Sequence, residues 1–108
     1  MGRPSSRIGS PPRRKLARAG RTVALSPSVS LELPPGEKGF LFNAQTGDLY
    51  VLNRVGAFIV RQFAAGKSIL NVAETIALQY RVAAEEALAD VLAFADQLKG
   101  LGIGSSRS

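Results

Sequence analysis

The stretch GFLFNAQTGDLYVLNRVGAFIVRQFAAG, residues 39–66, decides the fold of this chain of 108 residues. It opens with two short runs of aliphatic and aromatic residues, 39–43 and 49–52, around a loop that contains glycine. Such a pair of runs predicts an antiparallel hairpin. Asn53 then stands where it can cap a helix, and apolar residues follow at helical spacing up to Gly66. We therefore expect a hairpin that leads directly into a helix.

A further strand is predicted before this stretch. Residues 29–33 alternate strictly between apolar and polar side chains, which is the pattern of a strand with one buried face. Pro34 and Pro35 follow, and they end the strand because proline cannot donate a backbone N–H to a sheet. Both strands of the hairpin, by contrast, are apolar on both faces. One face must cover a core, so the apolar side chains on the other face require a separate explanation.

Two more helices are predicted after this stretch. Between residues 69 and 80 apolar side chains recur every three or four positions, behind Ser68 as the capping residue. The last helix begins near Ala83 or Ala84 and ends at Gly100, with apolar side chains gathered in one stripe. Carboxylates fall in its first turn, where the helix dipole favours negative charge.

Three strands followed by three helices predict an α+β domain. The expected architecture is winged-helix-like, with a three-stranded antiparallel sheet followed by three helices. Residues 25–104 form the predicted domain. Residues 1–24 are expected to be a disordered basic tail, and residues 105–108 a second disordered tail.

The positive charge of the chain is concentrated at its N-terminus. Its formal net charge is +6, from 14 Lys and Arg residues against 8 Asp and Glu residues. Residues 1–21 hold half of the basic residues and no acidic one, among several Pro, Gly and Ser residues. This composition is typical of disorder, and such a segment either contacts nucleic acid, acidic lipid or an acidic partner, or has no dedicated role. The basic residues in it are Arg3, Arg7, Arg13, Arg14, Lys15, Arg18 and Arg21.

The residue types that are missing exclude several classes of site. The chain has neither Cys nor His, which excludes a disulfide scaffold, a Cys or His zinc site, a thiol nucleophile and a histidine general base. No phosphate-binding glycine loop or nucleophile motif is present. We therefore expect no catalytic residues, no metal and no cofactor. No apolar run approaches the roughly 18–20 residues of a membrane span, so we expect a cytoplasmic protein.

A set of motifs spread over residues 25–103 carries a resemblance to a known family. The motifs are Leu25-Ser26-Pro27-x-Val29, Leu52-Asn53-x-x-Gly56-Ala57-x-Ile59, Gly66, Val72-Ala73-Glu74-x-Ile76-Ala77, Glu85-Glu86-Ala87-x-x-Asp90-Val91-x-x-Phe94, Leu98 and Gly100-Leu101. In their joint spacing they resemble the PqqD-like family of peptide chaperones, also called RiPP recognition elements. Ala83 departs from the pattern, because a capping Asp or Ser is expected at that position.

The resemblance implies a specific function. Members of the family are small winged-helix proteins without catalytic activity, which bind the leader of a ribosomally made precursor peptide and present it to a modifying enzyme. In pyrroloquinoline quinone synthesis the implied partner is a radical-SAM enzyme, and in lasso-peptide pathways it is a leader peptidase. The leader binds as an added strand on the edge of the third strand, in a groove against the third helix.

The residues of this chain permit such a mechanism. An unpaired edge strand offers backbone N–H and C=O groups to an extended peptide, and neighbouring side chains supply selectivity. Acidic residues on the last helix could meet a basic leader. The alternative is that the apolar candidates pack in the core and that the acidic ones form a solvated helix face. The candidate peptide-binding residues are Asp48, Leu49, Tyr50, Val51, Leu52, Glu86, Leu88, Asp90, Val91, Leu92 and Ala95.

The rival hypothesis is a winged-helix protein that binds nucleic acid through its basic N-terminal arm. A recognition helix needs Lys or Arg near the phosphates. The last predicted helix instead carries four carboxylates before Lys99, its only cation. We therefore expect no specific nucleic-acid binding, and the possibility of a homodimer formed through the exposed edge remains open.

Overall fold

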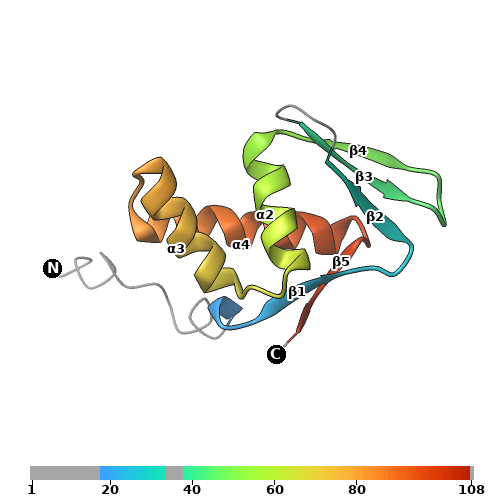
Figure 1. Cartoon of the computed structure of the whole chain (residues 1–108). Helices are drawn as coiled ribbons and strands as arrows, with labels where there is room; N and C mark the ends of the chain where they lie inside the picture. Colours follow the sequence, from blue (N-terminus) through green and yellow to red (C-terminus); the bar gives the residue numbers. More distant parts are fainter. Residues whose placement is uncertain (1–17, 34–37, 108) are drawn as a thin grey trace, which may run out of the picture.

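The computed structural model describes residues 18–33 and 38–107 (Figure 1). The strands are β1 (Thr22–Leu25), β2 (Val29–Glu32), β3 (Gly39–Asn43), β4 (Leu49–Leu52) and β5 (Gly104–Arg107). The helices are α2 (Arg54–Ala64), α3 (Ile69–Tyr80) and α4 (Ala84–Gly100). The predicted α+β class and the order of a three-stranded antiparallel sheet followed by three helices are confirmed.

The three-stranded sheet has the order β2-β3-β4, so β4 lies at its edge. Leu41 in the middle strand is fully buried and stands opposite Tyr50 of β4 and Leu31 of β2. Leu41, Leu52 and the half-buried Tyr50 lie on the face that covers the core, whereas Leu49 and Val51 point to the other face and are exposed. This alternation follows from the two-residue period of a strand.

A network centred on Asn43 holds the turn between β3 and β4. Its buried side-chain oxygen accepts hydrogen bonds from the Ser28 hydroxyl at 2.9 Å and from the Gln45 backbone N–H at 3.0 Å. Gly47 adopts a φ of 81°, a backbone conformation that glycine reaches without steric cost. The predicted loop at residues 44–48 is therefore a defined turn, and it fixes the register of the hairpin.

The first strand and the last form a second, two-stranded antiparallel sheet that the sequence did not predict. The two strands extend beyond the domain predicted for residues 25–104, since β1 begins at Thr22 and β5 ends at Arg107. Val23 anchors β1 in the core with 4% of its surface exposed. The Gly-Ser-Ser-Arg sequence of β5 has no apolar alternation, so its pattern predicts no strand; its residues pair with β1.

Parts of the predicted tails and turns lie outside the described residues. These are residues 1–17, for which disorder was predicted, the Pro34–Gly36 turn, and Ser108 at the C-terminus.

The predicted helix caps at Asn53 and Ser68 are confirmed. The Asn53 side chain accepts a hydrogen bond from the Gly56 N–H at 2.7 Å, and the Ser68 hydroxyl accepts one from the Asn71 N–H at 3.1 Å. Both bonds satisfy amides that have no partner within the helix. Ala83 gives α4 no side-chain cap, as its sequence implied.

Helix α4 ends at Gly100, as predicted, but Gly102 supplies the left-handed residue, with a φ of 75°. Two 3.0 Å hydrogen bonds close the turn, from the N–H of Gly102 to the carbonyl of Lys99 and from the N–H of Ile103 to the carbonyl of Leu98. This is the Schellman pattern. It buries Ile103 completely and directs the chain into β5.

Helix α4 runs along the core and has different neighbours at its two ends. In Figure 1 the first turns of α4 lie beside α3, and its last turns reach toward β4 and β5, with α2 crossing between the two regions. The largest fully buried side chains are Phe63, Leu41, Ile69, Ile103, Val60, Val72 and Val91. The arrangement leaves the last turns of α4 next to the edge strand β4.

Candidate functional site

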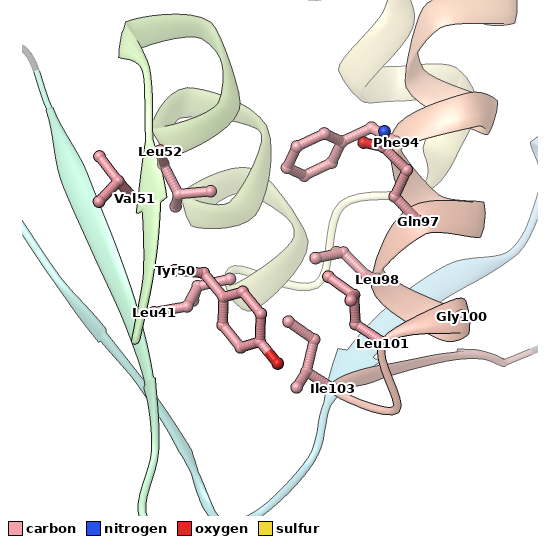
Figure 2. A pocket seen from close by; sticks show the side chains of 10 residues that line it. All are labelled: Leu41, Tyr50, Val51, Leu52, Phe94, Gln97, Leu98, Gly100, Leu101 and Ile103. Carbon is pink, nitrogen blue, oxygen red and sulfur yellow. The ribbon is translucent and has the colours of Figure 1, made fainter. Parts of the chain in front are cut away.

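A pocket of about 460 Å³ lies between the edge strand β4 and the last turns of α4 (Figure 2). Its lining is almost entirely apolar. The only polar side-chain groups in it are the Tyr50 hydroxyl and the Gln97 amide. The pocket is lined by Leu41, Tyr50, Val51, Leu52, Phe94, Gln97, Leu98, Gly100, Leu101 and Ile103.

The sheet forms one wall of the pocket. Figure 2 shows the side chains of Tyr50 and Leu52 pointing from β4 toward α4, with Leu41 of the neighbouring strand behind them. Val51 also borders the pocket, although its side chain points to the opposite face of the sheet. Because the side chain is directed away, Val51 contributes mainly its backbone to the pocket.

The helix forms the other wall. Phe94, Gln97 and Leu101 follow one another at intervals of three and four residues, so they lie on one face of the helix end. The Phe94 ring lies against the first turn of α2, where a Cβ at Gly56 would be 3.4 Å from Phe94 Cε1. Such a Cβ would only touch the ring and would lie 3.2 Å from Asn53 Oδ1, so a larger side chain at position 56 would press on both.

The edge of β4 that faces this pocket has no strand paired to it within the described residues. The N–H of Asn43 donates to the carbonyl of Asp48 at 2.9 Å, which makes these two residues a hydrogen-bonded pair. In an antiparallel ladder such pairs alternate with non-bonded pairs. Tyr50 and Leu52 therefore direct their backbone groups to β3, and Leu49 and Val51 direct theirs to the open edge.

A bond on the far side of β3 supports this alternation. The N–H of Ala44 donates to the carbonyl of Ser28 at 2.8 Å, so Phe42 is a bonded partner of β2 and not of β4. Since Phe42 stands opposite Leu49, the N–H and C=O groups of Leu49 are left for another strand.

Comparison with known proteins places the chain in a family. The family model of coenzyme PQQ synthesis protein D (PqqD) matches residues 38–103, which is more than half of the chain. The chain belongs to the PqqD family. The matched segment includes the edge strand, the three helices and every residue that lines the pocket.

Two solved structures share the fold of this PqqD-family protein. One is a lasso peptide synthetase B1 complexed with the leader peptide, with a TM-score of 0.70, 27% identity, and coverage of 77% of this chain and 96% of that chain. The other is TbiB1 in complex with the TbiA(beta) leader peptide, with a TM-score of 0.70, 22% identity, and coverage of 75% and 93%. Comparison with curated protein sequences gave no significant match.

The structure places the predicted strand residues of this PqqD-family protein at the pocket or its margin. Tyr50, Val51 and Leu52 border the pocket, and Leu49 lies beside them on the open edge. Asp48 lies at the start of the strand, where its carboxylate is 3.5 Å from the Tyr50 hydroxyl. Partial burial, and secondarily the charge of Asp48, raise the pKa of Tyr50 above its usual 10.0. The Tyr50 hydroxyl is therefore protonated at neutral pH.

The helix residues predicted for peptide binding do not line this pocket. Leu88, Val91, Leu92 and Ala95 have at most 6% of their surface exposed, because the centre of the apolar stripe packs into the core. Glu86 and Asp90 are exposed but are not among the lining residues.

The helix side of the pocket instead comes from Phe94, Gln97, Leu98 and Leu101, which the prediction did not include. They belong to the last turns of the helix and to the margin of its apolar stripe. The sequence contained one signal for them. Leu101 is an apolar residue directly after the predicted end of the helix at Gly100, where it is able to contact the sheet.

The exposed surface of α4 is acidic, which argues against a role as a recognition helix for nucleic acid. Glu85, Glu86, Asp90 and Asp96 are all exposed, and Asp96 forms an ion pair with Arg18. Carboxylates beside a polyanion are unfavourable. Within residues 18–33 and 38–107, no cluster of acidic side chains could hold a metal ion, and no helix is long and apolar enough to cross a membrane.

Proposed function

We propose that this PqqD-family protein binds the leader segment of a ribosomally made precursor peptide as an additional strand on β4. It then presents the peptide to a separate modifying enzyme. The observation that carries the proposal is the outward direction of the backbone groups of Leu49 and Val51 beside an apolar pocket. Extended peptides bind to sheet edges through such groups, and pockets for alternate side chains add selectivity.

In this proposal the two parts of the site have distinct tasks. The N–H and C=O groups of Leu49 and Val51 bind the peptide backbone and set its register. Every second side chain of the added strand then points toward α4 and enters the pocket. A pocket of about 460 Å³ accommodates one large apolar side chain. The Tyr50 hydroxyl and the Gln97 amide are available to a polar atom at its tip.

The two similar solved structures support this proposal, because each holds a leader peptide. The 27% identity with a lasso peptide synthetase B1 favours a lasso-type pathway, in which the partner enzyme is a leader peptidase. A radical-SAM enzyme is the corresponding partner in a quinone-cofactor pathway. In either case we assign the catalytic groups to the partner enzyme. Because the precursor is made by the ribosome, we place the complex in the cytoplasm.

The same open edge is suitable for a second copy of the chain, whose β4 would pair with this one. Such a homodimer and the peptide complex exclude each other, because both use the backbone groups of Leu49 and Val51. We therefore expect peptide binding to dissociate any dimer formed through this edge.

Titration of the isotopically labelled chain with its leader peptide tests the proposal. We expect the amide resonances of residues 48–52 and of Phe94 to Leu101 to shift together and to saturate. Absence of shifts, or shifts confined to residues 1–21, would overturn the proposal. Titration with a scrambled leader of the same composition is the matched control, and it should leave these resonances unchanged.

A further inference from the structure

Ser26 connects the two walls of the pocket, although it does not line the pocket itself. It lies between β1 and β2, in the Leu25-Ser26-Pro27 stretch of the sequence, and it is half-buried. Its backbone N–H donates to the carbonyl of Ile103 at 3.0 Å, and its hydroxyl donates to the carbonyl of Gly102 at 3.1 Å. One residue therefore binds two successive carbonyls of the turn that follows α4.

This turn carries part of the helix-side wall. Leu101 and Ile103 both line the pocket, and Figure 2 shows their side chains pointing from the end of α4 toward Tyr50. The N–H groups of Gly102 and Ile103 bind back to the helix, so the helix holds the turn by its N–H groups and Ser26 holds it by its carbonyls. Because Leu101 is 53% exposed, its own packing fixes its position only weakly.

The carbonyl of Ser26 makes the connection to the other wall. It accepts a hydrogen bond from the Val29 N–H at 2.9 Å, which closes a β-turn with Pro27 at its second position. Proline is favoured there, and its ring restricts the preceding residue to extended conformations. Val29 begins β2, which belongs to the sheet on the opposite side of the pocket. Ser26 thus joins the turn after α4 to this sheet, in a conformation that Pro27 restricts.

We propose that Ser26 is a positioning residue of the peptide site, and that its hydroxyl fixes the distance between the two walls of the pocket. This inference rests on the proposed function. The hydroxyl is what the side chain adds, since other residues also supply a backbone N–H and carbonyl. Gly102 is exposed, so without the hydroxyl water binds its carbonyl, and the turn that carries Leu101 shifts away from Tyr50. Leader affinity then falls although no group that touches the peptide has changed.

Three substitutions separate this positioning role from overall stability. Ser26→Ala removes the hydroxyl and keeps the backbone bonds. Ser26→Thr keeps a hydroxyl and suits an extended backbone, so it is the conservative variant. The matched control is Ser68→Ala, which removes the hydroxyl that accepts from the Asn71 N–H at 3.1 Å, at the start of α3 and outside the pocket. Urea unfolding establishes that each variant is folded and measures its stability.

The measured quantity is the Kd for the synthetic leader of the precursor whose gene adjoins that of this chain, labelled with a fluorophore. For Ser26→Ala we expect the Kd to rise about fivefold, which is the effect of one hydrogen bond. Ser26→Thr should stay within about twofold of the wild type, and Ser68→Ala should lose stability with its Kd unchanged. A Kd that rises in both alanine variants in proportion to their loss of stability would show a merely structural role and overturn the inference.

A double-mutant cycle tests whether Ser26 acts through the turn. Leu101→Ala shortens a side chain that the turn carries into the pocket, so in this background Ser26→Ala should raise the Kd by less than about twofold. The same loss in both backgrounds would overturn the positioning role. An unchanged Kd in Ser26→Ala, with a wild type that binds the leader, would overturn this inference and leave the proposed function standing. Failure of the wild-type chain to bind the leader would overturn both.

Discussion

Asn43 donates its backbone N–H to the carbonyl of Asp48 at 2.9 Å, and this bond decides which residues of β4 face the open edge. Counting from this pair, Tyr50 is bonded to Leu41 of β3, and Val51 is not bonded to Phe40. Two adjacent residues of one strand therefore have opposite roles. The backbone of Tyr50 holds the sheet together, and the backbone of Val51 is available to a ligand.

Proline scanning of β4 separates these two roles. Val51→Pro removes an N–H that no neighbouring strand uses, so we expect a stable fold and a loss of leader affinity of about tenfold. Tyr50→Pro removes an N–H within the β3–β4 ladder, so we expect the free energy of unfolding to fall by about 1–3 kcal/mol. Chemical denaturation and calorimetric titration measure the two effects. Equal affinity of wild type and Val51→Pro would exclude strand addition at this edge.

The contact between Gly56 and Phe94 predicts that the pocket depends on a residue outside its lining. A Cβ at position 56 would already touch the Phe94 ring at 3.4 Å and lie 3.2 Å from Asn53 Oδ1, so the further methyl groups of a valine would press on the ring. Gly56→Val should therefore displace the ring, lower the free energy of unfolding by about 1–3 kcal/mol and weaken leader binding. In the double variant Gly56→Val, Phe94→Ala the stability should be higher than the sum of the single effects predicts. Strictly additive effects would contradict the contact.

Leu101 should contribute to binding more than to stability. It lines the pocket but is 53% exposed, so Leu101→Ala removes little buried surface from the folded chain. We expect a loss of stability below about 1 kcal/mol and a loss of leader affinity of about five- to tenfold. Leu98→Ala, at a residue only 3% exposed, should instead cost about 2–5 kcal/mol of stability. Unchanged leader affinity in Leu101→Ala would remove this residue from the site.

Local patterns in the sequence were sufficient for most of the fold. Alternation and helical spacing predicted β2, the β3–β4 hairpin and the three helices. The capping chemistry of Asn53 and Ser68 placed two of the helix starts correctly. These features depend on neighbours within a few residues, and such short-range constraints are visible in a single chain.

The missed features depend on contacts between distant parts of the chain. β5 has no side-chain pattern of its own, and only its pairing with β1 makes it a strand. On α4 the sequence showed an apolar stripe, but not which part of it α3 covers. Leu88 and Leu92 were therefore predicted to lie beside the strand edge, although they are in the core. Phe94 and Leu101, which line the pocket, were not predicted.

The Tyr50 phenol predicts how stability responds to alkaline pH. Burial and then the Asp48 carboxylate raise its pKa above the usual 10.0, so the folded state favours the protonated phenol. This contribution to stability is complete below pH 10.0 and is lost as the pH rises through the higher pKa of the folded state. Chemical denaturation between pH 7 and 11 should therefore show a steeper alkaline loss for wild type than for Tyr50→Phe. Parallel curves would contradict a raised pKa.

Truncation tests whether β5 belongs to the folded domain. Removal of residues 104–108 deletes β5, the partner of β1, but keeps the hydrogen bond that the Ser26 hydroxyl donates to the Gly102 carbonyl at 3.1 Å. It also exposes Val23, which is 4% exposed in the intact chain, so we expect the free energy of unfolding to fall by about 2 kcal/mol or more. A chain that lacks only Ser108 is the matched control and should unfold like the wild type. Equal stability of the two truncated chains would show that the two-stranded sheet contributes nothing to the fold, and the domain would then end at residue 104, as its sequence first indicated.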